Sequence, residues 1–134
     1  MEMIVDFPGG SRVDAHFGSH TVQTDQPVAA GGESSAPPPF DVFLASLATC
    51  AGVYVLGFCR RRSLPTEGIR LVQRVETNPS TKMVEKVLLD IQLPADFPEQ
   101  YKAAVIRAAE QCKVKKHLEQ PPVFEVKTSA ASAT

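Results

Sequence analysis

Apolar and polar positions alternate along the amino-terminal part of the chain. Residues 2–6 and 12–24 place apolar side chains between polar ones, with a Pro-Gly-Gly turn signal at 8–10. This pattern predicts short strands joined in a small antiparallel meander. Residues 25–39 are rich in Pro, Gly, Ser and Ala and lack periodicity, which predicts a loop. A loop of this length is typical of a segment that covers or lines a site.

A long apolar segment follows this loop. Three prolines at 37–39 hold the chain extended, so a helix can begin only after them, with Asp41 in its first turn. The apolar pattern predicts that this helix ends at about Arg62. From Val42 to Cys59 no residue is charged, and apolar or small side chains occupy every face. We expect a helix that is buried all round, and covering it in so small a chain favours a homodimer.

The same segment must be weighed as a membrane span. Residues 42–59 are 18 positions without charge, and Arg60–Arg62 would serve as a cytoplasmic flank. The segment is nevertheless short for a span and rich in Ala, Gly, Ser and Thr rather than Leu. Amphipathic elements of a soluble type surround it, so we predict no membrane insertion.

The carboxyl-terminal half predicts a hairpin. Residues 68–77 and 83–93 have the composition of longer strands, and they flank the turn-forming cluster at 78–80.

A second helix and a last strand are predicted after the hairpin. Apolar positions recur at helical spacing from Tyr101 to Cys112, which places Cys112 at the carboxyl end of the buried stripe of an amphipathic helix. Residues 123–126 predict a final strand, and 127–134 predict a frayed tail.

Length and composition narrow the class of protein. A chain of 134 residues fits a single domain, residues 1–134, and the order of elements predicts an α+β fold with helices packed on antiparallel sheets. The net charge of −1 provides no basic field for nucleic acid, and the short run Arg60–Arg62 does not supply one. We therefore predict no nucleic-acid partner.

The amino terminus and the cysteines bear on location. No basic region followed by an apolar run and a cleavage site opens the sequence, so we expect no secretory signal and a cytoplasmic location. Three widely spaced cysteines, Cys50, Cys59 and Cys112, argue for thiols in a reducing compartment. Without a Cys-x-x-Cys motif or a histidine cluster, we predict no metal site and no bound cofactor.

Two of the cysteines share the long helix. Nine residues in a helix correspond to opposite faces and about 13 Å along the axis, so Cys50 and Cys59 cannot form a disulfide with each other. Cys59 is interpreted as a spectator. Because Cys112 lies on the buried stripe of the second helix, packing of two helices could bring it to Cys50. The alternative is that both are small buried hydrophobic side chains, and spacing leaves the two interpretations open.

A thiol in the middle of an apolar helix needs activation. Apolar surroundings raise the pKa of a thiol, and Cys50 is too far from the start of its own helix to use the dipole. Arg12 could supply a cation, with Asp41 holding the guanidinium in a bidentate pair. Alternatively, Arg12 is a solvated strand residue and Asp41 a helix-start carboxylate.

Three motifs in order resemble the OsmC/Ohr family. They are TDQPVAAGG, PPPFDVFLASLATCAG and RAAEQCKVKKHL, whose two cysteines are Cys50 and Cys112, and the resemblance covers about residues 10 to 126. It implies an intertwined α+β homodimer, with two central helices wrapped by antiparallel sheets and a thiol-dependent site at the dimer interface.

The resemblance also implies chemistry. Cys50 is similar to the peroxidatic cysteine of this family, whose thiolate reduces an organic hydroperoxide, with hydrogen peroxide as a further substrate, and becomes a sulfenic acid. Cys112 resembles the resolving cysteine, which then forms a disulfide with Cys50. An external dithiol would restore both thiols by exchange. Apolar surroundings favour a small apolar hydroperoxide as the substrate.

One departure from the family pattern concerns activation. The family's hydroperoxide reductases carry a Glu in the turn before the cysteine helix, paired with an Arg from the amino-terminal region. Here Asp41 is the nearest carboxylate and Arg12 the only upstream Arg, so both are expected in the catalytic site. Two alternatives for the same scaffold are a thioesterase-like enzyme with dispensable cysteines and a non-enzymatic small-ligand binder.

Overall fold

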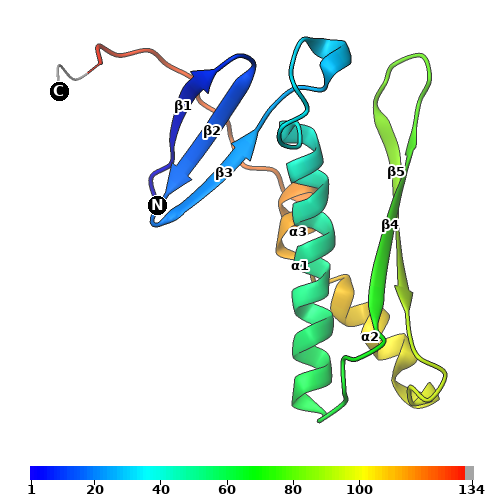
Figure 1. Cartoon of the computed structure of the whole chain (residues 1–134). Coiled ribbons are helices and arrows are strands. Elements are labelled where there is room, and N and C mark those ends of the chain that lie inside the picture. Colours follow the sequence, from blue (N-terminus) through cyan, green and yellow to red (C-terminus); the bar gives the residue numbers. More distant parts are fainter. Residues whose placement is uncertain (132–134) are drawn as a thin grey trace. The chain divides into compact units, whose positions relative to one another are not determined.

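The computed structural model describes residues 1–131, and the end of the predicted tail, 132–134, lies outside the described residues. Figure 1 shows the elements in chain order. They form two compact units, each built from separate stretches of sequence. The first contains Met1–Thr49 and Val72–Leu89, and the second contains Cys50–Leu71 and the described residues from Asp90 onward.

The predicted amino-terminal meander is confirmed. Strands β1 (Ile4–Gly9), β2 (Arg12–Phe17) and β3 (His20–Thr24) form an antiparallel sheet in the order β1-β2-β3. Gly10 and Gly18 turn the chain between them with positive φ angles of 58° and 56°, which a residue without a Cβ adopts without strain.

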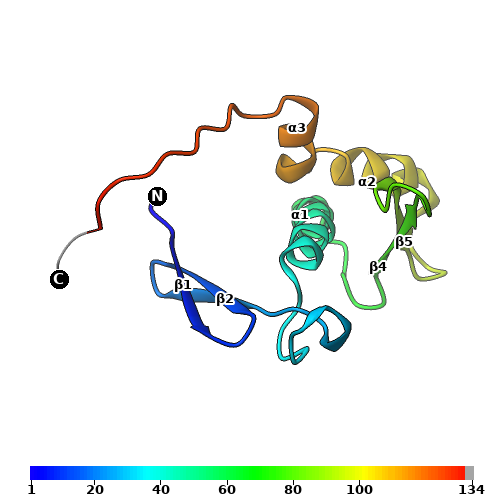
Figure 2. The same ribbon diagram turned by 90° about the horizontal axis from the view of Figure 1, so that it is seen from above.

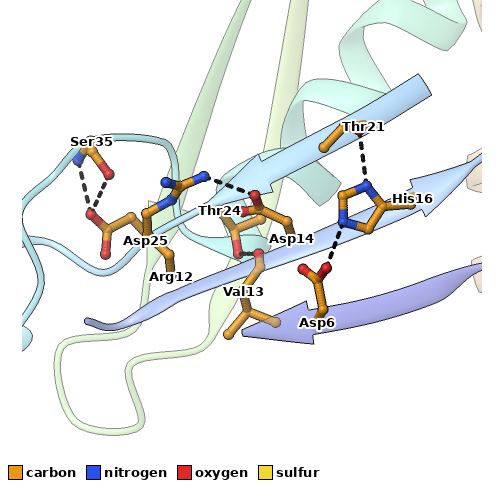
Figure 3. Close-up of polar contacts among 9 residues, drawn as sticks. All are labelled: Asp6, Arg12, Val13, Asp14, His16, Thr21, Thr24, Asp25 and Ser35. Carbon is orange, nitrogen blue, oxygen red and sulfur yellow. Dashed lines mark hydrogen bonds and ion pairs between the residues drawn. The ribbon is translucent and has the colours of Figure 1, made fainter. Parts of the chain in front are cut away.

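The predicted loop between β3 and the long helix is built around one carboxylate. Asp25 is buried and accepts hydrogen bonds from the backbone N–H groups of Gln26 (2.7 Å), Glu33 (3.3 Å) and Ser35 (3.0 Å). The Ser35 hydroxyl donates a further bond of 2.6 Å, as Figure 3 shows. These bonds, the Ser35 hydroxyl first, lower the pKa of Asp25 to about 2. The loop is therefore ordered by a charged acceptor rather than by an apolar core.

The long helix α1 spans Pro39–Arg61, close to the predicted bounds. It begins at the third proline, where the missing N–H costs nothing, and ends with two arginines that suit the negative end of the dipole. By length and composition alone, α1 is the one helix in the described part of the chain that could cross a membrane, with a mean hydropathy of 2.0 over 18 residues.

The expectation that this helix is buried all round is wrong for the single chain. Only four of its residues are buried, namely Ala51, Val55, Phe58 and Cys59, and Val53 is 64% exposed. An α-helix presents a full circumference of side chains, and one chain of this size supplies cover for part of it.

The predicted hairpin is confirmed. Strands β4 (Arg70–Thr77) and β5 (Val84–Gln92) form a two-stranded sheet. Its turn is closed by Asn78, whose side-chain oxygen accepts the backbone N–H groups of Ser80 (2.8 Å) and Thr81 (3.0 Å). This use of an Asn side chain is an ordinary way to stabilise a turn.

The predicted second helix is divided in the structure. A 3-10 turn at Glu99–Tyr101 leads into α2 (Lys102–Ala109), and a separate helix α3 (Lys113–Glu119) follows. Figure 2 shows α2 and α3 as distinct helices. Cys112 has non-helical backbone angles (φ −45°, ψ 119°), so it begins α3 instead of ending the preceding helix. The sequence-based boundary was wrong because the apolar spacing continues across this break.

The predicted last strand is also wrong. Residues 121–131 form neither helix nor strand, and Val123, Phe124 and Val126 are almost fully exposed. Four residues with alternating side chains form a strand only where an edge is available to pair with them.

Candidate thiol site

The second unit brings Cys50 and Cys112 together. Cys50, in the middle of α1, is half-buried, whereas Cys112 is 3% exposed at the start of α3. The two side chains are hydrogen-bonded to each other. The structure therefore brings the two thiols together, as the packing of two helices allowed, and their role as a functional pair stays a prediction.

The first turn of α3 contacts both sulfur atoms. Cys112 is the N-cap residue, and its Sγ accepts the backbone N–H of Lys115 at 3.4 Å. The backbone N–H groups of Lys113 and Val114 donate to Cys50. These amides have no carbonyl partner within the helix, so a sulfur that carries negative charge is a favourable acceptor for them.

These contacts lower the pKa of the Cys50 thiol. The largest cause is the hydrogen bond from the Val114 N–H, and partial burial opposes it. The Cys112 side chain, the Lys113 N–H and the positive charge of Lys113 lower the pKa further. Cys50 is indeed far from the start of its own helix, and the amides that act on it belong to a different helix, α3.

Cys59 has a contrasting environment on the same helix. It is fully buried, and burial raises the pKa of its thiol, while the charge of Arg62 acts weakly in the opposite direction. The Arg62 guanidinium lies 3.8 Å from the centre of the Phe58 ring, and that ring meets Tyr101 edge-on at 6.0 Å. This aromatic contact fills the space near the end of α1, consistent with a packing role for Cys59.

Arg12 and Asp41 do not form the predicted ion pair. Arg12 Nη2 instead contacts Asp14 Oδ2 at 2.8 Å on the same face of β2, as Figure 3 shows. Asp14 is buried, and Asp41 is exposed at the start of α1. Side chains two positions apart on a strand share a face, so Asp14 reaches Arg12 without any change in backbone. The roles of Arg12 and Asp41 in catalysis stay predictions.

Arg12 also lines a polar cavity within the first unit. The cavity is partly open to solvent, has a volume of about 240 Å³, and is lined by the turn at 8–11, by Arg12 and Asp25, and by residues 31–33. Neighbouring bonds in Figure 3 order the sheet: Thr24 bonds to the Val13 carbonyl, and His16 lies between Asp6 (3.1 Å) and Thr21 (3.0 Å).

Sequence analysis missed Asp14, Lys113 and Val114. The signal for Asp14 was its position two residues after Arg12 on a predicted strand. For Lys113 and Val114 the signal was weak, because Cys is not a usual N-cap residue and the start of α3 was hidden inside the apolar spacing.

Comparison with known proteins adds to this geometry. A family model described as OsmC-like protein matches residues 31–127. The chain belongs to the OsmC-like family. The matched range contains Cys50 and Cys112, whereas Arg12 precedes it. The resemblance noted from the sequence motifs is thereby confirmed.

Solved structures share this OsmC-like fold. A candidate osmotic stress induced and detoxification response protein from Psychrobacter arcticus 273-4 is 23% identical, with a TM-score of 0.72 and 85% of each chain covered. An organic hydroperoxide resistance protein OsmC from Legionella pneumophila is 19% identical (TM-score 0.55, 88% of this chain and 89% of that one).

A third OsmC-like structure carries a ligand. It is a candidate organic hydroperoxide resistance protein from Vibrio cholerae O1 biovar eltor, with captopril bound in one of its active sites. It is 16% identical (TM-score 0.56, 90% of this chain and 86% of that one). At these identities the likeness establishes the α+β fold. A search of curated proteins found no significant match.

Proposed function

We propose that this protein is a thiol-dependent peroxidase that reduces organic hydroperoxides through Cys50 and Cys112. One observation carries the proposal: the two thiols are hydrogen-bonded, and the half-exposed one has a lowered pKa. Membership of the OsmC-like family supports it, since that family includes proteins named for hydroperoxide resistance.

The first step consumes the peroxide. The Cys50 thiolate attacks the distal oxygen of R–OOH, the O–O bond breaks, and the leaving alkoxide takes a proton to become an alcohol. Cys50 becomes a sulfenic acid, so the sulfur loses two electrons and the peroxide gains them. Cys50 suits this role because its sulfur is the more exposed of the pair, whereas Cys112 is buried.

The second step closes the disulfide. The Cys112 thiol attacks the Cys50 sulfenic acid, an S–S bond forms, and water leaves with the sulfenic oxygen. An external dithiol then reduces the disulfide by two exchange steps and becomes a disulfide itself.

Substrate preference follows from the surroundings of Cys50. Its helix neighbours are apolar or small from Val42 to Cys59. Each methylene that a substrate transfers from water to such surroundings contributes about 0.8 kcal/mol, so alkyl or aryl hydroperoxides are favoured over hydrogen peroxide. We further propose that Arg12 and Asp41 assist the reaction and that the protein acts in the cytoplasm.

The proposal includes a homodimer instead of membrane insertion. Phe40 and Val53 of α1 and Ile4 and Phe7 of β1 are more than half exposed in the single chain. Apolar area of this kind is normally covered by a partner. Sedimentation without detergent is expected to give twice the chain mass of 14.5 kDa. A monomer, or a protein recovered only with membranes, would contradict this part of the proposal.

A turnover assay tests the proposed activity. Purified protein is mixed with cumene hydroperoxide and a dithiol, and we expect catalytic formation of one cumyl alcohol per dithiol oxidised. An acyl thioester serves as the comparison substrate. Peroxide consumption no faster than the dithiol alone would contradict the proposal, and thioester hydrolysis in its place would favour the thioesterase alternative.

A further inference from the structure

The helix α3 depends on the sulfur atoms that it contacts. This helix has seven residues, all within the described part of the chain. None of these residues is buried. A helix this short is marginal in water unless packing or capping stabilises it. Its N-cap is the Cys112 sulfur, which accepts the Lys115 N–H at 3.4 Å.

Charges within α3 add little to its stability. Lys113 and Lys116 are three positions apart, a spacing at which like charges repel. Within α3, Lys115 Nζ lies 3.8 Å from Glu119 Oε1, and both side chains are exposed, so this ion pair contributes little. Contacts with the two sulfurs are therefore among the interactions that hold the first turn in place.

Oxidation changes those contacts. In the dithiol form, the N–H groups of Lys113 and Val114 donate to Cys50, and that of Lys115 donates to Cys112. A disulfide requires the two sulfurs to approach to about 2.05 Å with a fixed dihedral angle, and it leaves neither sulfur with a negative charge. A disulfide sulfur is a weak acceptor, so the Lys113 and Val114 N–H groups lose the favourable acceptor that a Cys50 thiolate provides. The approach of the two sulfurs also moves the Cys112 sulfur relative to the Lys115 N–H that it caps.

We propose that α3 is a redox-sensitive element: it is folded while Cys50 and Cys112 are thiols and frays when they form a disulfide. This inference rests on the proposed function for the oxidant, a hydroperoxide. It goes beyond that function because it assigns a conformational change to the peptide Lys113–Gln120.

The change would serve the reductive half of the cycle. Cys112 is 3% exposed, and an external dithiol must reach a disulfide sulfur along the S–S axis to reduce it. Fraying of α3 would uncover that sulfur in the oxidised form alone. In the reduced form the helix would keep the resolving thiol covered, which limits its oxidation by other reagents.

Hydrogen exchange of the whole chain tests the inference. The bridge is formed with diamide, an oxidant that takes two electrons from a pair of thiols, and separately with cumene hydroperoxide. We expect backbone amides of 113–119 to exchange at least about ten times faster in the bridged protein than in the reduced protein. Trypsin is expected to cleave after Lys113 and Lys116 faster in the bridged form.

Controls separate local fraying from general loosening. Amides of α2, which contains the buried residues Val105 and Ala109, should exchange equally in both forms. The variant Cys59→Ser should show the same difference as the wild type. Equal exchange of 113–119 in the two forms, or a bridged form in which α2 loosens as much as α3, would overturn the inference.

The two oxidants separate this inference from the proposed function. If diamide forms the bridge and α3 frays while hydroperoxide does nothing, the inference stands and the peroxidase proposal fails. If both oxidants form the bridge and α3 stays protected, the peroxidase proposal stands and the inference is wrong. Failure of diamide to form a Cys50–Cys112 bridge would also overturn the inference.

Discussion

Cys50 and Cys59 lie nine residues apart on one helix of nearly uniform apolar composition, yet their surroundings shift their pKa values in opposite directions. Cys50 meets backbone N–H groups from α3, and its pKa falls. Cys59 is fully buried, and burial raises its pKa. The comparison shows that the reactivity of a thiol on an apolar helix is set by which element packs against it.

The largest expected effect separates the two cysteines by function. Cys50→Ser should lower hydroperoxide turnover by about 10³-fold or more, because the nucleophile is lost. Cys59→Ser should retain turnover within about two-fold. Steady-state kinetics with cumene hydroperoxide measure both. Comparable losses of turnover in the two variants would contradict the different roles assigned to Cys50 and Cys59.

A second change removes the main contact that distinguishes Cys50. Val114→Pro deletes the N–H that donates to Cys50, and proline is tolerated in the first turn of a helix. Because this hydrogen bond is the largest cause of the lowered pKa, the pKa of Cys50 should rise in the variant. Alkylation rate against pH measures it.

Val114→Ala is the matched control for that proline variant, because it shortens the side chain and keeps the N–H. Its Cys50 pKa should equal the wild-type value. The pKa of Cys59 should not change in either variant. A Cys50 pKa that is the same in Val114→Pro and Val114→Ala would show that the backbone bond is not the cause.

A smaller effect is expected from the charge of Lys113. Lys113→Gln keeps the backbone N–H and removes a positive charge that lowers the pKa of Cys50. Because Lys113 is exposed, the rise should be smaller than the rise in Val114→Pro. High salt should shrink the difference between variant and wild type by screening. A difference that is independent of salt would point to a structural cause.

Asp25 extends the comparison to a hydrogen-bonded group outside the thiol pair. Its folded-state pKa, about 2, lies below the ordinary value of 3.8. The stabilisation that it provides is therefore fully present above pH 3.8 and is lost as the pH falls toward 2. Asp25→Asn should be less stable than wild type at pH 7, and the difference should disappear through that window in thermal unfolding. Equal stability at pH 7 would contradict this role.

Regular patterns in the sequence were sufficient for most of the fold. The strands β1 to β5 and the bounds of α1 follow from alternation, turn residues and prolines, which act locally. The division between α2 and α3 could not be predicted, because it depends on the Cys112 sulfur replacing an oxygen as N-cap. The final strand failed for a related reason: residues 123–126 have strand alternation, and pairing depends on an edge elsewhere.

The candidate site was predictable in part. Cys50 and Cys112 follow from the motifs and from the stripe that carries Cys112. Their activation was not predictable, since it depends on backbone amides that have no sequence signature. The predicted partner of Arg12, Asp41, was wrong. The choice between Asp14 and Asp41 depends on which carboxylate is buried beside the guanidinium, and spacing alone does not show burial.

The most direct test of the central claim is a map of disulfides after peroxide treatment. The reduced protein receives one equivalent of cumene hydroperoxide, remaining thiols are alkylated, and peptides are analysed by mass without reduction. We predict one bridge within a single chain, joining Cys50 and Cys112, with Cys59 still a thiol. A bridge that includes Cys59, a bridge between two chains, or Cys50 oxidised without any bridge would contradict the account.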